Sequence, residues 1–275
     1  MRKVIFPAAL AVLCIPVVAV LAQEKPASTP DKPAAAQEKK LDVDPQEIIR
    51  KFAAKEAEFR EARNNYTYRQ SVKLEELDPG GSPSGGKWEE ITDIIFSPDG
   101  KRVEKPIYAP VQNLHNIQLT PQDLQDIRDV QPFVLTSVDI VNYNVAYLGH
   151  ENVDEIGCYT FSVKPKKLEK DKRYFEGQIW VDDRDLQIVK TYGKGVGIVS
   201  KNNQFAKFET YRQQIDGKYW FPVYTHADDT LHFPDGQNQR IRQTIKYDNY
   251  KKFEGRSTIT YGGTVDTPPA PTKKK

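Results

Sequence analysis

Cysteine, methionine and unbalanced charge are all scarce in this sequence. Among 275 residues there are 2 Cys and 1 Met, and 40 basic residues against 38 acidic ones leave a formal net charge of +2. A nucleic-acid-binding chain normally carries a clustered basic excess, and here the sequence shows one only at residues 273–275. We therefore expect no nucleic-acid partner.

Hydrophobic residues are also fewer than usual, at 38% of the chain, but 12 Phe, 14 Tyr and 3 Trp are enough to fill a core. The composition excludes collagen-like, coiled-coil and multi-span membrane proteins. What remains is a soluble domain with an exported N-terminus.

The N-terminus reads as a secretory signal over residues 1–22. Two basic residues precede an apolar run from Val4 to Leu21, and small residues before the end of the run suit cleavage after Ala22. Cys14 could belong to a lipoprotein signal, but Leu13 before it is too large, so we expect no lipidation. We expect the protein in the periplasm.

The mature chain then holds one cysteine, Cys158, so it can form no internal disulfide and must rely on its core for stability. Residues 23–40 are rich in Pro, Ala, Lys, Glu and Gln and predict a disordered linker. Residues 265–275 predict a disordered tail in the same way. The expected folded domain is 41–264.

Two segments begin as helices. Asp44 as N-cap, Pro45 at the first position and Glu47 reaching back to the cap predict a helix to about Arg63. The segment 120–123 predicts a short second helix. The apolar faces carry Ile48, Ile49, Phe52, Phe59 and Ala62 in the first helix, and Leu124 and Ile127 in the second.

Most of the remaining sequence predicts strands joined by hairpin turns. The expected strands are 66–77, 88–96, 101–107, 145–149, 158–164, 174–181, 186–192, 206–215, 219–226, 230–233 and 241–247. Consecutive hairpins indicate an antiparallel meander. The predicted fold is mainly β (α+β), a large antiparallel sheet of about ten strands with two covering helices.

The hairpin 174–192 allows one sheet face to be predicted in detail. A four-residue turn at 182–185 would place Val181 opposite Leu186 and Ile179 opposite Ile188, on one face with Phe175. On the preceding strand the apolar alternation is Tyr159, Phe161 and Val163. Two helices barely cover ten strands, so part of this face could stay open as an apolar groove. The alternative is a core closed by helices and loops, which we expect for most of these residues.

The segments 147–154, 158–166, 173–182 and 186–190 carry a recurring pattern. A G-x-E-x-V-D turn, an aromatic strand ending near Lys-Pro, and G-x-I-W-V-D leading into I-V-K follow one another. Over 145–192 this pattern resembles the bacterial outer-membrane lipoprotein-sorting superfamily, which includes LolA-, LolB-, LppX- and RseB-like proteins.

The resemblance implies an incomplete antiparallel β-barrel whose concave apolar face receives the acyl chains of a lipid or lipoprotein under helical lids. The lipid-binding residues on that face would be Tyr159, Phe161, Val163, Phe175, Ile179, Val181, Leu186 and Ile188. Arg69 is the candidate for the arginine that holds the lid closed. The implied protein is a monomeric carrier; the alternative is an RseB-like sensor that regulates a membrane-anchored partner protein.

No pattern for catalysis or metal binding stands out. The four His lack metal-ligand spacing, and Glu75 and Glu76 point to opposite strand faces, so they cannot act jointly. The acidic segment 182–185 lacks EF-hand spacing, so we interpret it as a hairpin turn and not as a Ca²⁺ site. Cys158 has no base partner and is expected to be a small buried filler. We expect no enzyme activity, no metal and no cofactor.

Overall fold

The structure is a computed structural model that describes residues 44–97, 101–198 and 204–252. The chain divides into two units, Met1–Lys40 and Leu41–Lys275, and every described residue lies in the second. The expected signal peptide at 1–22 with Cys14, the linker at 23–40, both bounds of the domain 41–264 and the tail at 265–275 lie outside the described residues.

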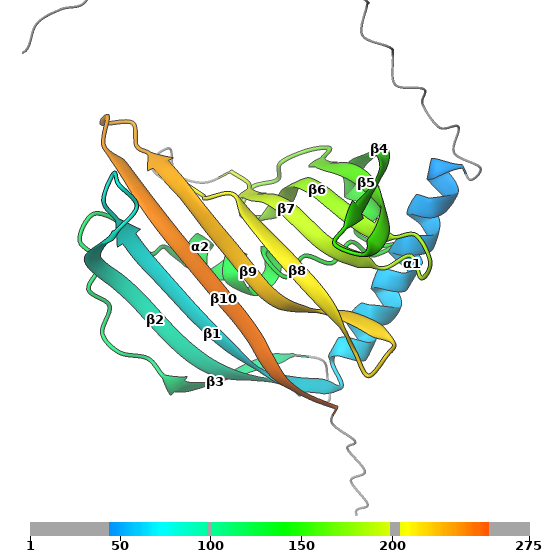
Figure 1. Ribbon diagram of the computed structural model, residues 1–275, viewed down its shortest axis with the longest axis horizontal. Helices are drawn as coiled ribbons and strands as arrows, with labels where there is room; N and C mark the ends of the chain where they lie inside the picture. The colour runs from blue at the N-terminus through cyan, green and yellow to red at the C-terminus, as the bar shows by residue number, and fades with distance from the viewer. Residues whose placement is uncertain (1–43, 98–100, 199–203, 253–275) are drawn as a thin grey trace, which may run out of the picture. The chain divides into compact units, whose positions relative to one another are not determined.

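Ten antiparallel strands form one open sheet (Figure 1). Their bounds are β1 Tyr66–Leu77, β2 Pro83–Phe96, β3 Arg102–Tyr108, β4 Tyr143–Val153, β5 Ile156–Pro165, β6 Tyr174–Asp182, β7 Ile188–Val196, β8 Phe208–Ile215, β9 Tyr219–His232 and β10 Asn238–Lys252. The sheet is not closed, as in an incomplete barrel. The predicted fold class is confirmed.

The strand order is β3-β2-β1-β10-β9-β8-β7-β6-β5-β4, so β3 and β4 are the two edges of the sheet. Residues 109–142, which we call the crossover segment, must therefore run from one edge to the other. They contain α2 Pro121–Gln125, the single-turn π-helix η1 Asp126–Val130 and the 3₁₀ turn η2 Ile140–Asn142. Figure 1 shows α2 behind β9 and β10.

Contacts along the crossover segment trace its path over the sheet. Asn113 exchanges hydrogen bonds with β2, residues 115–117 donate to β1, Gln131 bonds to β10, and Phe133 stacks on Phe175 of β6. The face beneath the crossover segment is also covered by α1, Pro45–Arg63. We call it the covered face of the sheet.

The helix α1 has the predicted bounds. Asp44 accepts from the backbone N–H of Gln46 at 3.0 Å, and Pro45 occupies the first helical position, where no N–H is needed. Glu47 does not return to the cap as expected, because it pairs with Lys51 one turn later at 2.7 Å. No helix in residues 44–97, 101–198 or 204–252 is both long and apolar enough to cross a membrane.

The predicted register of the β6–β7 hairpin is wrong. Val181 lies opposite Ile188, and after a bulge Ile179 lies opposite Thr191. Leu186 has φ 57° and its N–H donates to the carbonyl of Asp182, so it belongs to the turn and not to the strand. Because the sheet also bulges here, the same apolar residues still share the covered face.

The strands expected at 219–226 and 230–233 are one strand, β9. The polar residues between them predicted a break, but Asp228 pairs across to Arg240 and Arg242 on β10 at 2.9 and 3.0 Å. Ala227 beside it is buried. Cross-strand ion pairs thus allow acidic residues to continue the strand.

Candidate functional site

The eight predicted lipid-binding residues all meet in one apolar cluster. Six of them are at most 1% exposed, and Tyr159 and Leu186 are partly buried against the same cluster. The cluster is covered by Ile48, Ile49, Phe52 and Ala53 of α1 and by Val130, Phe133 and Leu135 of the crossover segment. In this conformation this half of the covered face is a closed core.

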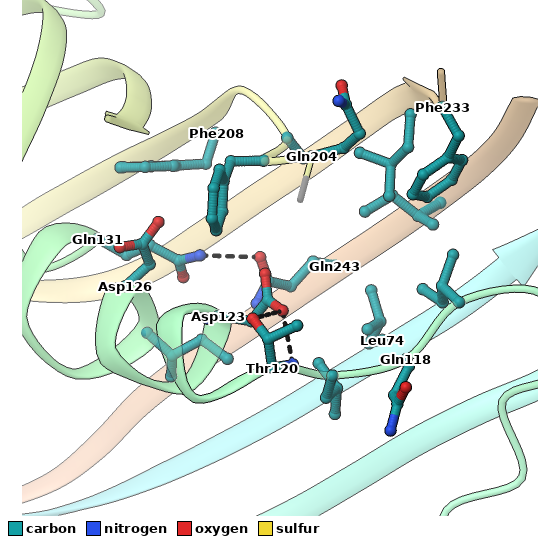
Figure 2. A pocket seen from close by; sticks show the side chains of 17 residues that line it. Leu74, Gln118, Thr120, Asp123, Asp126, Gln131, Gln204, Phe208, Phe233 and Gln243 are labelled. Atoms are coloured by element: carbon teal, nitrogen blue, oxygen red, sulfur yellow. Dashed lines mark hydrogen bonds between the residues drawn. The ribbon is translucent and has the colours of Figure 1, made fainter. Parts of the chain in front are cut away.

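A partly open pocket lies on the other half of the covered face, between β1, β9 and β10 and the crossover segment (Figure 2). Its volume is about 110 Å³. The apolar lining comes from the strands and the segments next to them (Leu74, Leu231 and Ile241, with Phe233 just after β9), from the crossover segment (Ile117, Leu119 and Ile127), and from Phe205 and Ala206 before β8 with Phe208 at its start. We call this the crossover pocket.

One end of the crossover pocket is polar. Gln131 donates to Gln243 at 2.9 Å, and Figure 2 shows this bond spanning the pocket. The Gln131 Oε1 atom is buried and has no hydrogen-bond partner among the described residues. Asp123 accepts from the hydroxyl and N–H of Thr120 at 2.6 and 2.7 Å, while burial raises the pKa of this carboxyl.

The crossover pocket is too small for a long acyl chain. A cavity of roughly 150 Å³ holds one benzene molecule. At about 110 Å³, this pocket accepts only a few carbon atoms. A longer chain enters only if the crossover segment or α1 moves away from the sheet, so the described conformation is a closed one.

A buried ion pair fixes α1 to the sheet. Glu56 of α1 and Arg212 of β8 have side chains 0% and 1% exposed, with Arg212 Nη1 3.0 Å from Glu56 Oε1. The same carboxylate accepts the N–H of Ile188 at 3.3 Å, and Arg212 also donates to the carbonyl of Phe133. Burial raises the pKa of Glu56, against the effect of the Arg212 charge. Arg212 therefore joins α1 and the crossover segment to the sheet.

A second arginine holds η1. Arg173, just before β6, donates to Asp126 through Nε at 2.8 Å, and both side chains are more than nine-tenths buried. Its guanidinium lies 3.9 Å from the centre of the Phe205 ring, which lines the crossover pocket. This pair anchors the polar end of the pocket.

Arg69, the candidate for a lid contact, pairs within the sheet. It donates two bonds to Asp93 on the neighbouring strand β2, at 2.7 and 3.1 Å, and its side chain is 38% exposed. Because Arg69 alternates with the buried Tyr68 and Gln70, it points to the face of the sheet opposite the covered face.

One carboxylate clips the crossover segment onto β1. Glu76 is fully buried, and its Oε1 accepts the backbone N–H groups of His115, Asn116 and Ile117 at 3.0, 2.7 and 3.0 Å. Glu75 faces the other way and pairs with Lys73, so the expectation of opposite faces is confirmed. Ile117 lines the crossover pocket, and the clip therefore holds part of its wall.

Replacing Glu76 with glutamine is expected to loosen this wall without unfolding the sheet. Three charge-assisted hydrogen bonds become neutral ones, and each such bond to a charged group contributes roughly 1.5–3 kcal/mol. We expect amide hydrogen exchange at residues 115–117 to accelerate at least about tenfold, a change of ~1.4 kcal/mol in local opening. Glu75→Gln is the matched control, and equal exchange in both variants would contradict the clip.

Cys158 and the acidic turn 182–185 are the reactive groups that the sequence singles out. Cys158 is buried and its thiol donates to the carbonyl of Ile156, and burial raises the pKa of the thiol to about 11, so it is poorly nucleophilic. In the turn 182–185, Asp182 and Asp185 accept backbone N–H groups, as turn chemistry predicts. The described side chains contain no group of three or more His, Cys, Asp or Glu placed to hold a metal ion.

These observations define an open ten-stranded half-barrel that has one covered face and a small, mainly apolar pocket on that face. No protein-family model and no curated protein matches the sequence. Solved structures similar to it include a DUF1329 family protein from Desulfovibrio piger, with 18% identity over 78% of this chain and 96% of that chain and a TM-score of 0.43.

A LolA superfamily protein from Nitrosomonas europaea is 12% identical over 78% of this chain and 94% of that chain, with a TM-score of 0.33. MucB in complex with MucA(peri) is 9% identical over 77% and 100%, with a TM-score of 0.23. All of these TM-scores are below 0.5, and no site residue or function is transferred from these structures.

Proposed function

We propose that this protein is a periplasmic lipid- or lipoprotein-binding protein that shelters acyl chains on the covered face of its sheet. The observation that carries the proposal is the crossover pocket, a partly open and mainly apolar space whose covering segment is held by a few polar contacts. A role in outer-membrane lipoprotein sorting agrees with the sequence pattern over 145–192.

The physical driver is burial of the acyl chain. Each methylene moved out of water contributes about 0.8 kcal/mol. The closed core around Phe161 and Ile179 continues the apolar wall beyond the pocket, with Phe208 common to both. Movement of the crossover segment would therefore join the small pocket to a larger apolar surface.

The alternative is a sensor of the same fold that binds a lipid or peptide and regulates a membrane-anchored partner. The strand rhythm does not change within β8–β10, and these strands continue the same sheet, which supports the carrier over a two-domain sensor. We propose a binding protein and not an enzyme, because no nucleophile with a neighbouring base was found in the sequence.

A titration with an environment-sensitive fluorescent acyl probe tests the proposal. We expect saturable binding that palmitic acid displaces, because probe and competitor share the same apolar site. Fluorescence that rises linearly with probe concentration and ignores the competitor would count against an acyl-binding function.

A further inference from the structure

A second cleft lies where the C-terminal end of α1, η1, the end of β2 and the start of β3 come together. Its volume is about 260 Å³, and it shares no lining residue with the crossover pocket. Four arginines line it, together with an asparagine, a phenylalanine and two acidic residues: Arg60, Arg63, Arg102, Arg128, Asn64, Phe96, Glu61 and Asp129.

Arg63 carries a positive charge that acts on the buried Glu56, a carboxylate already paired with Arg212. It is partly buried, its Nε is enclosed without a hydrogen-bond partner, and no carboxylate of the described residues forms an ion pair with it. Its guanidinium lies 5.7 Å from the centre of the Phe96 ring. Burial, together with the nearby charges of Arg102 and Arg212, lowers the pKa of Arg63 from its ordinary value.

The other charges of the cleft are arranged around Arg63 without pairing to it. Arg60 pairs with Asp139 at 3.0 Å, and Arg102 pairs with Glu104 at 2.7 Å. Arg128 is exposed and forms no ion pair with a described residue. The acidic residues at the cleft, Glu61 and Asp129, are likewise exposed and unpaired within the described part of the chain, so they leave Arg63 uncompensated.

A partly buried cation without an ion-pair partner is destabilising, because its desolvation is not offset. Such groups are concentrated at sites that bind ligands or substrates. Guanidinium groups offer forked N–H donors that match phosphate oxygens in pairs, and Arg63 and Arg128 both have unused donors at this cleft.

We propose that this cleft is a binding site for a phosphate group, with Arg63 as the principal ligand and Arg128 as a second one at the mouth. The group could be a free phosphate ion or the headgroup of a phospholipid, because both present the same oxygens. The site is independent of acyl-chain binding in the crossover pocket.

Calorimetric titration at low salt with inorganic phosphate and with glycerol 3-phosphate, which presents a phospholipid headgroup without an acyl chain, tests the proposal on the full chain. For the wild type we expect saturable binding of at least one of the two. Arg63→Gln should weaken it at least about tenfold, since two or more charge-assisted hydrogen bonds are lost. Arg50→Gln, which removes an exposed arginine from the same helix, should leave it unchanged.

Thermal unfolding of the same variants shows whether Arg63 binds phosphate or stabilises the fold. Because Arg63 is unpaired, Arg63→Gln should melt at the same temperature as the wild type or higher. Binding of inorganic phosphate supports an ion site, and binding of glycerol 3-phosphate alone supports a headgroup site. Absence of binding for both anions, unchanged binding in Arg63→Gln, or a clearly lower melting temperature in that variant would overturn the proposal.

Arg128→Gln provides a second variant that does not depend on the interior. Its side chain is exposed, so folding should be unaffected. We expect a severalfold loss of phosphate affinity. Wild-type affinity in both Arg63→Gln and Arg128→Gln would place any bound anion elsewhere and refute the site.

Discussion

Replacing Glu56 with glutamine is expected to lower the free energy of unfolding by about 3–5 kcal/mol, the range for breaking a buried ion pair by removing one partner. Arg212 would remain buried with its charge uncompensated, since its side chain is 1% exposed. The N–H of Ile188 would also face a weaker acceptor. Urea unfolding followed by tryptophan fluorescence measures the effect.

A double variant shows whether the charge or the packing is responsible. Glu56→Leu combined with Arg212→Met removes both charges together and should cost much less than either change alone, because no unpaired charge is left. Glu47→Gln is a surface control on the same helix and should cost no more than about 0.5 kcal/mol. A loss below about 1 kcal/mol in Glu56→Gln would contradict the role of this pair in holding α1.

Filling the crossover pocket should weaken acyl binding about tenfold or more while leaving the fold intact. Ala206 lines the pocket, and Ala206→Phe would place a ring in a space of about 110 Å³. Two displaced methylenes alone correspond to ~1.6 kcal/mol, so affinity for a fluorescent acyl probe should fall about tenfold or more. Filling an existing cavity usually preserves or raises stability, so the melting temperature should not fall.

The control introduces the same phenylalanine side chain on the surface. Val138 is 69% exposed and does not line the crossover pocket, so Val138→Phe should bind the probe like the wild type. Equal probe affinity in Ala206→Phe and Val138→Phe would place acyl binding outside the crossover pocket.

Local patterns in the sequence predict most of the fold. Asp44 with Pro45 starts α1, and turn residues such as Asp216 and Gly217 adopt the positive φ that a tight hairpin requires. These signals are short-range, so they can be read from a few neighbouring residues. In β9, acidic residues interrupt the apolar alternation, and the pattern wrongly predicts that the strand ends there. The strand continues because basic residues of the neighbouring β10 pair with Asp228.

The candidate site could be predicted only in part. Alternation correctly places Phe161, Ile179 and Ile188 on one face, but it cannot show whether a helix covers them. Since they form a closed core, a charge at Ile179 would report on folding and not on ligand loading. The crossover pocket depends on residues 117–131 meeting β9 and β10, a long-range contact that periodicity does not encode.

The sequence pattern also does not predict the polar side chains that hold α1 and the crossover segment against the sheet, because their contacts are long-range too. Glu56 falls within the apolar stripe of α1, and Arg212 lies 156 residues away. Hydropathy reads both as surface residues. In the sequence, Glu76 is only one of two consecutive acidic residues. The path of the crossover segment brings three backbone N–H groups to its carboxylate.

Native mass spectrometry of the gently purified protein tests most directly whether it binds acyl chains. We predict a bound species with the mass of a lipid or acylated peptide, which organic extraction removes and added lipid restores. A spectrum that shows only the bare chain, before and after incubation with lipid, would contradict the account.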